Sequence, residues 1–392
     1  MRTVYLDHSA TTPVHPKVLE AMLPYYQDEY GNASSLHRLG RNARLALDQA
    51  REKVAAALHA RSDDIYFTSG GTEGDNLAIK GTAFALRDRG RHIITSQIEH
   101  EAVLNTCGYL EKNGFEVTYL PVDGHGSVGL DDLKKAVTDQ TILISIMHAN
   151  NEVGTIQPIA EIGALARERG IVFHTDAVQT VGKIPVDIKD LNVDLLAMSG
   201  HKFYGPKGVG AIYMRRGVKV SPLAHGGHHE NWKRAGTENV PGIVGLAAAL
   251  EACVAEMEET AEREGQLRDA LQKGIQEKVE AVRINGHPDR RLPGSLSVCF
   301  EALEGEALIL SLDLKGIAAS TGSACSSGSL EPSHVLKAMG IPIEIAHGSA
   351  RFTLGRSNTR EEIDYVLEVL PDIVERLRTM SPVRLSKSDG EA

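Results

Sequence analysis

A run of apolar residues gives way to a polar, glycine-rich turn in the stretch DLLAMSGHKFYGPKG, residues 194–208. The run 195–199 is typical of a buried strand, and Lys202 lies just beyond its end. A second apolar run, residues 171–175, ends directly before Asp176. Parallel strands end at a common edge of a sheet, and open α/β sheets bind their ligands there. We therefore expect Lys202 and Asp176 to lie close together.

Two interpretations fit this pair of residues. A lysine amine beside a carboxylate suits a pyridoxal phosphate site, where the lysine forms a Schiff base and the acid binds the pyridinium nitrogen. Alternatively, Lys202 is a solvated residue of a turn that contains glycine and proline. The remaining polar segments of the chain bear on this choice.

Short apolar runs alternate with helical periodicity from about residue 14 to residue 257. The expected strands are residues 65–69, 92–96, 117–120, 142–147, 171–175, 195–199 and 209–214. Between the strands, apolar residues recur every three or four positions, as in Ala43, Leu47, Ala50, Val54 and Leu58. This alternation predicts an α/β fold with a mostly parallel, seven-stranded sheet that is covered by helices.

The pattern changes after a stretch rich in Glu and Ala, residues 241–282, which we expect to be helical and to link two domains. Beyond it we expect strands at 295–300, 317–320 and 349–354 and a helix at 305–314. A final helix has the apolar face Ile363, Val366, Leu367, Leu370, Ile373, Val374 and Leu377. These boundaries predict a large domain, residues 15–257, a small α+β domain, residues 1–14 and 258–380, and a polar tail, residues 381–392.

The composition argues against several classes of protein. The 392 residues have a net charge of −10 and no long run of Lys or Arg, which is unlike a nucleic-acid-binding protein. No stretch approaches the ~18 apolar residues of a membrane span, and the N-terminus lacks the apolar core of a signal peptide. None of the four cysteines forms a CxxC pair, so we expect no disulfide framework and a cytoplasmic enzyme.

A glycine-rich turn, residues 68–76, joins the first expected strand to an amphipathic helix. Free backbone N–H groups and the positive end of a helix dipole make such a turn suitable for a phosphate. Gly70 and Gly71 allow close approach, and the hydroxyl of Thr72 adds a donor. The alternative is a structural turn in which Thr72 caps the helix.

Other polar residues follow the expected strands at the same edge of the sheet. His100 comes after the strand 92–96 and could stack on an aromatic cofactor or carry protons. It could equally cap a helix or lie on the surface. Asn151 follows the strand 142–147, and Gln179 lies three residues beyond Asp176, so both would bring amide groups to this edge.

Two residues of the small domain are candidates for chemistry. Cys325 lies in the loop STGSACSSGS, residues 320–329, whose small residues have little to bury, so an accessible thiol could act as a nucleophile there. Alternatively, Cys325 is an incidental thiol in a flexible loop. The other three cysteines lie in apolar or helical settings that are typical of packing residues. Arg351 lies on an apolar strand, where its planar guanidinium group could bind a substrate carboxylate or form a structural ion pair.

The loop His225-Gly226-Gly227-His228-His229-Glu230 has the residue types of a zinc site. Adjacent His228 and His229 are expected to point in different directions, and the sequence contains no second ligand cluster. We therefore interpret the loop as a polar loop of an active site and keep a non-catalytic metal-binding protein as the alternative of a different class.

Taken together, the motifs resemble those of the cysteine desulfurases of the nitrogen-fixation and housekeeping iron–sulfur type, which are fold-type I pyridoxal phosphate enzymes. The resemblance covers nearly the full length of the chain. The motifs, in order, are YLDHSATTP (5–13), SGGTE (69–73), NE (151–152), HTDA (174–177), SGHK (199–202), RAGTEN (234–239), SAC (323–325) and RF (351–352).

The resemblance implies a role for each matching residue. Lys202 would hold pyridoxal 5'-phosphate as a Schiff base, Asp176 would pair with the pyridine nitrogen, and His100 would stack on the ring. The residues implied to contact the cofactor elsewhere are Gly71, Thr72, Asn151, Gln179, Ser199, Gly200, His201 and, from a neighbouring subunit, Thr237. Arg351, with Asn151, would bind the substrate.

The implied activity is conversion of L-cysteine to L-alanine, with the sulfur held as a persulfide on Cys325. The length of the cysteine loop resembles the subgroup that passes sulfur to an iron–sulfur scaffold protein, and Cys325 could transiently ligate a cluster there. The family also implies a homodimer and no intrinsic metal. A selenocysteine lyase or a related aminotransferase is the nearest alternative.

Overall fold

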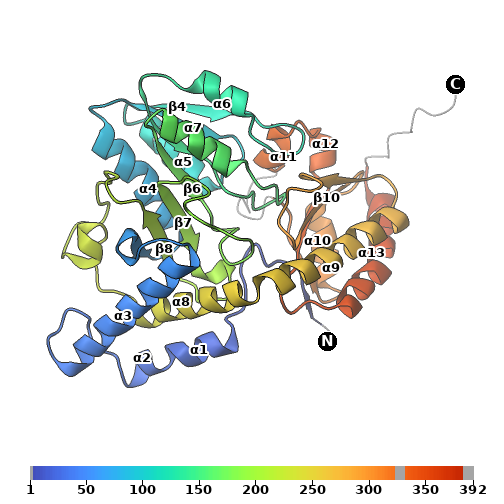
Figure 1. Ribbon diagram of the computed structural model, residues 1–392. Helices are drawn as coiled ribbons and strands as arrows, with labels where there is room; N and C mark the ends of the chain where they lie inside the picture. Colours follow the sequence, from blue (N-terminus) through green and yellow to red (C-terminus); the bar gives the residue numbers. More distant parts are fainter. Residues whose placement is uncertain (1–2, 323–331, 383–392) are drawn as a thin grey trace.

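The computed structural model describes residues 3–322 and 332–382 (Figure 1). Its centre is a seven-stranded sheet with the order β2-β8-β7-β6-β5-β3-β4. These strands are β2 (Ile65–Thr68), β3 (His92–Ser96), β4 (Glu116–Leu120), β5 (Thr141–Ser145), β6 (Val172–Asp176), β7 (Leu195–Ser199) and β8 (Gly210–Met214). β8 runs antiparallel to both of its neighbours, and the other pairings are parallel. The prediction of a mostly parallel sheet is confirmed.

Helices cover both faces of this sheet (Figure 1). They are α3 (Arg38–Ala57), α4 (Gly71–Leu86), α5 (Glu101–Glu111), α6 (Leu130–Ala136), α7 (Ile159–Glu168) and α8 (Val240–Ala255). α1 (Pro16–Met22) and α2 (Pro24–Gln27) pack on α8. Ile93 and Leu143 pack with α4 and α5, whereas Ile94 and Ile144 belong to the core that includes α3, α7 and α8. Neighbouring residues of a strand point to opposite faces, which explains why strands buried on both faces carry apolar residues at consecutive positions.

A second, smaller unit contains the antiparallel sheet β12-β10-β9. Its elements are α9 (Met257–Lys278), β9 (Val282–Asn285), β10 (Ser295–Phe300), α10 (Gly305–Asp313), α11 (His334–Ala338), α12 (Ile343–Ala346), β12 (Ser349–Thr353) and α13 (Arg360–Met380). Val298 and Phe352 pack against α9, α10 and α13, and Cys299 packs on the other face with α11 and α12. The predicted strands, the helix after β10 and the apolar face of the final helix are confirmed.

The stretch expected to be a helical link is helical but broken. Residues 241–282 form two helices, α8 and α9, which meet at an angle of 73°, and Val282 already belongs to β9. Glu256 separates them with non-helical dihedral angles (φ −112°, ψ 11°), because α8 packs on the large sheet and α9 on the small one. Among the described residues no single helix is long and apolar enough to cross a membrane. In this part of the chain only α8 and α9 taken together reach the required length and apolar composition, and they are bent.

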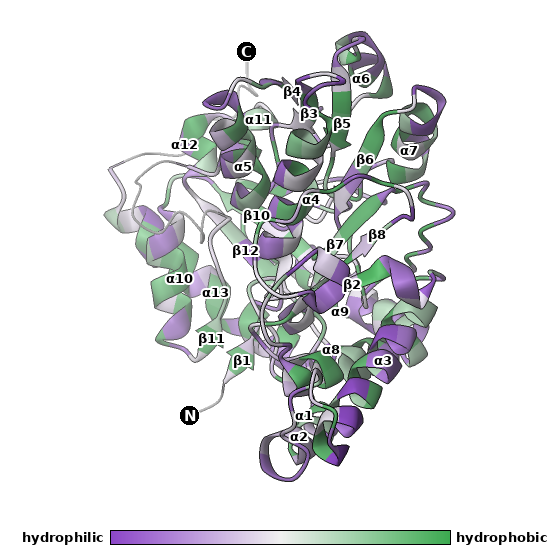
Figure 2. Cartoon of the chain, turned by 90° about the vertical axis from the view of Figure 1, so that its left-hand side faces the viewer, coloured by the Kyte–Doolittle hydropathy of each residue, from purple (hydrophilic) through white to green (hydrophobic). Residues whose placement is uncertain are grey.

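The start of the chain joins the two units. β1 (Val4–Tyr5) pairs in parallel with β11 (Ile317–Ala318) of the small unit, and the following residues reach the large unit, where Thr12 N donates to the carbonyl of His201 (3.0 Å). β1 and the edge strand β9 are too short for a periodic signal and were not predicted. Figure 2 shows the hydropathy pattern of the chain: β5 is largely apolar, and α3 has polar and apolar faces.

Candidate active site

A pocket of about 320 Å³ lies at the carboxyl edge of the large sheet. β6 and β7 are parallel neighbours, so Asp176 at the end of β6 and Lys202 after β7 reach the same cavity, as predicted. The predicted site residues that line it are Gly71, Thr72, His100, Asn151, Asp176, Gln179, Ser199, His201, Lys202 and Arg351. Gly200 is buried and does not line the pocket, Thr237 is exposed elsewhere, and Cys325 lies outside the described residues.

Lys202 is held by the beginning of the chain. It ends a short 3-10 turn, Gly200–Lys202, and its Nζ donates to the carbonyl oxygens of Ser9 (2.5 Å) and Ala10 (3.0 Å). Two carbonyl acceptors direct the amine to one wall of the pocket. Ser9 and Ala10 were not predicted as site residues, because their backbone oxygens carry no side-chain signal in the sequence.

Asp176 is a buried carboxyl group at the floor of the pocket. Burial raises its pKa, while the charges of His100 and Lys202 and a hydrogen bond from Val178 N to Oδ1 (2.9 Å) act in the opposite direction. The carboxylate form of Asp176 therefore depends on cationic groups in the same pocket. A positively charged ring nitrogen placed there would add to that stabilisation.

His100 is both a helix cap and a pocket residue. Its Nδ1 accepts a hydrogen bond from Ala102 N (3.0 Å) at the first turn of α5, and the ring lines the pocket. Because Nδ1 accepts, the proton of the neutral ring lies on Nε2. The interpretations of His100 as a helix cap and as a site residue are therefore compatible, because the cap hydrogen bond fixes the orientation of the ring that lines the pocket.

Gln179 is oriented from both ends of its amide. Its Nε2 donates to Ser9 O (3.0 Å) and its Oε1 accepts from Nζ of Lys183 (3.0 Å). This pair of partners assigns the amide unambiguously, with the NH₂ group on the side of Lys202. Burial lowers the pKa of Lys183 to about 8, and the nearby charge of Lys202 adds to that effect.

The N-terminus of α4 forms another wall of the pocket. A Cβ at Gly71 would lie 2.5 Å from Cγ2 of Val178, so only glycine fits where the helix meets this loop. The helix is capped by Gly70 without a side-chain hydrogen bond, and the alternative in which Thr72 caps it was wrong. Thr72 lies at the second helical position, near Ser199 and among the first backbone N–H groups of the helix, an arrangement that suits an anion.

Arg351 enters from β12 of the small unit. Its side chain is 4% exposed; Nη2 donates to Oδ1 of Asp7 (2.8 Å) and Nη1 to the carbonyl of Asn151 (3.0 Å). The structural ion pair that sequence analysis left open is thus present. The guanidinium also lines the pocket, and its buried Nε has no hydrogen-bond partner among the described residues. A carboxylate in the pocket could use the remaining donor capacity.

Asp75 was missed by the sequence analysis. It lies on the buried face of α4, lines the pocket, and its Oδ1 is 3.5 Å from Nε2 of His174, whose Nδ1 contacts Oγ of Ser145 (2.9 Å). Burial raises the pKa of Asp75 well above its usual range, and the charges of Asp176 and Glu99 add to the shift. The available signal was an acid on the apolar face of a helix next to Ala78 and Ile79.

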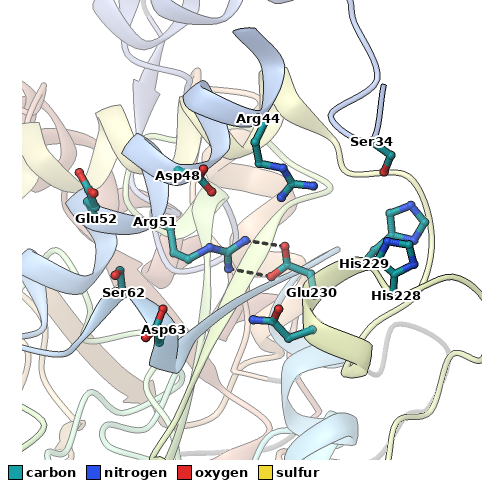
Figure 3. Close-up of a pocket in the computed structure, with 11 residues that line it drawn as sticks. Ser34, Arg44, Asp48, Arg51, Glu52, Ser62, Asp63, His228, His229 and Glu230 are labelled. Carbon is teal, nitrogen blue, oxygen red and sulfur yellow. Dashed lines mark hydrogen bonds and ion pairs between the residues drawn. The ribbon is translucent and has the colours of Figure 1, made fainter. Parts of the chain in front are cut away.

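The histidine loop is not a metal site in the described part of the chain, where no group of three His, Cys, Asp or Glu side chains is placed to hold an ion. The expectation that His228 and His229 diverge was wrong, because their rings are stacked with centroids 6.2 Å apart. They line a separate pocket of about 550 Å³, in which Arg51 and Glu230 form a bidentate ion pair (Figure 3).

The other cysteines are packing residues, as predicted. Cys107, Cys253 and Cys299 are buried, and burial raises their pKa values to about 12, 11 and 11. None of these thiols lines the pocket. Cys325 therefore stays the candidate nucleophile on the basis of its sequence.

Known proteins share this architecture. The aminotransferase class-V family matches residues 4–366. The cysteine desulfurase IscS of Methanosarcina thermophila is 60% identical over 382 residues, which cover 97% of this chain and 94% of the relative. Among solved structures, a NifS-like protein has a TM-score of 0.91 at 44% identity, covering 96% of this chain and 100% of that chain. SspA in complex with cysteine has a TM-score of 0.82 at 41% identity, covering 91% and 100%. The chain therefore belongs to the class-V aminotransferases, among the cysteine desulfurases.

Proposed function

We propose that this chain is a pyridoxal 5'-phosphate-dependent cysteine desulfurase. The observation that carries the proposal is the meeting of Lys202 and the buried acid Asp176 in one pocket. Further features suit the cofactor and its substrate: the N-terminus of α4 lines the pocket at Gly71 and Thr72 and suits a phosphate. The Nε of Arg351, which has no hydrogen-bond partner among the described residues, suits a carboxylate. The family of the chain and a solved relative bound to cysteine support the same assignment.

Each pocket residue then has a task toward the cofactor. Lys202 would attach it, Asp176 would hold a proton on its pyridine nitrogen, and the ring of His100 would stack on it. Gln179 and Asn151 would contact the phenolic oxygen or the substrate. The phosphate would be held by Gly71, Thr72, Ser199, Gly200, His201 and, from the partner copy of a homodimer, Thr237.

Removal of the Cα proton begins the reaction. When bound, the cofactor supplies an electron sink for negative charge at Cα. Arg351 binds the substrate carboxylate and orients Cα toward Lys202. Lys202, displaced by the substrate amine, acts as the general base. Its amine is already directed by the carbonyls of Ser9 and Ala10, which supports this role.

Cys325 then accepts the sulfur. Its thiolate attacks the sulfur of L-cysteine, so an S–S bond forms while the Cβ–S bond breaks, and the electron pair of that bond goes to the substrate carbon. That carbon takes up a proton, which His100 can deliver, Lys202 returns a proton to Cα, and the product leaves as L-alanine. One thiol and one cysteine thus become one persulfide and one alanine. An iron–sulfur scaffold protein is the proposed acceptor, and Cys325 could ligate its cluster transiently.

The decisive experiment follows labelled sulfur. We expect the wild-type protein to absorb near the band of a lysine-bound pyridoxal phosphate, to lose that band on borohydride reduction, and to retain ³⁵S from L-cysteine on the protein. Cys325→Ala should keep the band and lose the bound ³⁵S, with alanine formation slowed by about 100-fold or more.

Other outcomes would select the alternatives. A protein without the absorbance band does not bind the cofactor. Turnover that requires a keto acid would identify an aminotransferase, and a strong preference for selenocysteine over cysteine would identify a selenocysteine lyase. Sulfide release by Cys325→Ala at the wild-type rate would contradict the role of this thiol.

A further inference from the structure

Glu152 is a buried acid that the proposed mechanism does not use. It follows Asn151 in the turn after β5, and only 5% of the residue is exposed. The turn is tightly held, because the N–H groups of Glu152 (2.9 Å) and Val153 (3.0 Å) both donate to Oδ1 of Asn150. The Asn150 amide in turn donates to Ile98 O (2.9 Å). The backbone from which the Glu152 side chain projects is therefore fixed.

This carboxyl group contacts the residue that begins α11. Oε2 of Glu152 accepts a hydrogen bond of 2.5 Å from Oγ of Ser333. The same Oγ accepts hydrogen bonds from Val335 N (3.1 Å) and Leu336 N (3.2 Å) as the N-cap of the helix. Because both lone pairs of the hydroxyl are occupied, its proton points to Glu152.

The same oxygen also faces Gly322. A Cβ at Gly322 would lie 2.7 Å from Oε2 of Glu152, so this backbone packs directly on the carboxyl group. Gly322 and Ser333 flank residues 323–331, the segment that contains Cys325 and lies outside the described residues. One buried oxygen atom therefore contacts the chain on both sides of that segment.

Glu152 is also joined to the substrate side of the pocket. Its neighbour Asn151 lines the pocket and accepts from Nη1 of Arg351 (3.0 Å). Ser320, two residues before Gly322, exchanges backbone hydrogen bonds with Arg351 (3.2 and 2.6 Å). Burial raises the pKa of Glu152 to about 7, while the Ser333 hydrogen bond and the charges of Arg351 and His100 lower it, so a share of the group is ionised at neutral pH.

We propose that Glu152 is a positioning residue for sulfur transfer, which holds Gly322 and Ser333, the two flanks of the Cys325 segment, beside the residues that bind the substrate. The inference rests on the proposed function, because it assumes that Cys325 accepts sulfur. The physical effect is one of effective concentration: fixing both ends of a connecting segment limits the volume its thiol can sample. Glu152 itself does not touch the reacting atoms.

The test separates sulfur transfer from the earlier steps. In a single turnover of the cofactor-loaded protein with L-[³⁵S]cysteine, Glu152→Ala should slow the appearance of ³⁵S on the protein by about 10-fold or more. Exchange of the substrate Cα proton with solvent should stay near the wild-type rate, because Lys202 and Asp176 are unchanged. Glu152→Gln keeps an acceptor for Ser333 and should restore most of the rate.

Two further variants make the result specific. Ser333→Ala removes the other half of the contact and should slow transfer to a similar extent, and the double variant Glu152→Ala/Ser333→Ala should be no slower than the slower single variant. If Glu152→Ala fails to fold, the rate of sulfur transfer in Ser333→Ala still tests the proposal. Glu344→Ala, an exposed acid on α12, is the matched control and should behave as wild type.

The outcomes that overturn the proposal are distinct from failure of the proposed function. Wild-type sulfur transfer in Glu152→Ala and Ser333→Ala, or an equal loss of Cα–H exchange and sulfur transfer, would show that Glu152 does not position the segment. If Cys325→Ala in the otherwise wild-type chain still retains ³⁵S, the proposed function itself fails.

Discussion

Glu99 is a single buried residue that makes the stability of this fold depend on pH. It is fully buried, its Oε1 accepts from Oγ of Ser96 (2.6 Å), and Met147 N donates to both carboxyl oxygens (3.0 and 3.1 Å). Burial raises its pKa to about 8, against the effect of these hydrogen bonds. Because this pKa lies above that of the unfolded chain, the folded state binds more protons between about pH 5 and pH 8.

Stability should therefore fall as the pH rises through this window, and Glu99→Gln should remove part of the fall. The shift corresponds to a loss on the order of 3 kcal/mol between about pH 5.5 and pH 8 from this one group. Urea unfolding of wild type and variant at these two pH values measures the difference. Equal losses in both proteins would show that Glu99 is ionised in the folded state.

Residue contacts also explain why single polar positions were hard to rank from sequence. His100 was left open between a cap and a site residue, and it is a cap whose ring lines the pocket. Arg351 was left open between an ion pair and a substrate site, and it forms the ion pair at the pocket wall. Because each side chain has several polar atoms, the structural contact leaves room for the proposed contact with cofactor or substrate.

The contact between α9 and α13 shows how helices set the spacing of the small unit. A Cβ at Gly274 of α9 would lie 2.3 Å from Cδ1 of Leu367 on α13, and Leu367 is buried in the same core. The glycine therefore allows a closer approach of the two helices than any other residue would. Gly265 lies on the same helix with no atom within 4 Å of such a Cβ.

These two glycines make a matched pair of substitutions. Gly274→Ala should destabilise the protein by about 1–3 kcal/mol, because the added methyl group overfills the helix contact. Gly265→Ala should instead stabilise it by about 0.5–1 kcal/mol through helix propensity. Midpoints of urea unfolding measure both effects, and a stabilised Gly274→Ala variant would mean that Leu367 moves aside without cost.

Elements were predicted from sequence where their burial is regular. Most of the strands β2 to β8 are short, largely buried runs, and α13 has one apolar face, so hydrophobic patterning located them. The break at Glu256 was missed, because both halves of the stretch have helical composition. The break reflects where each half packs, on the large or the small sheet, and no local pattern records that choice.

At the scale of the whole molecule, the first residues of the chain connect the two units to the pocket. β1 pairs with β11 of the small unit, Asp7 pairs with Arg351 (2.8 Å), and Ser9 and Ala10 bind Lys202 through their carbonyls. The pocket therefore contains groups from the start, the middle and the end of the sequence. Its geometry depends on the docking of both units.

Asp7 tests this connection. Asp7→Ala leaves the buried guanidinium of Arg351 without its carboxylate and should destabilise the protein by about 2 kcal/mol, less than for a fully buried pair because Asp7 is partly exposed. Asp7→Asn keeps an acceptor and should lose less. Unfolding midpoints compare the two variants, and an unchanged midpoint in Asp7→Ala would show that solvent or substrate groups replace the ion pair fully.

The sequence by itself determined the class of fold, because alternating strands and helices bury residues in patterns that repeat over a few positions. It also predicted that Lys202 and Asp176 meet, since both follow strands of one parallel sheet. Only the tertiary structure decided what surrounds them: the carbonyls of Ser9 and Ala10, the Asp75–His174 contact, and the position of Glu152 between Gly322 and Ser333. These contacts join residues separated by about one hundred positions or more, and such pairs are set by how whole units pack, which no short stretch of sequence encodes.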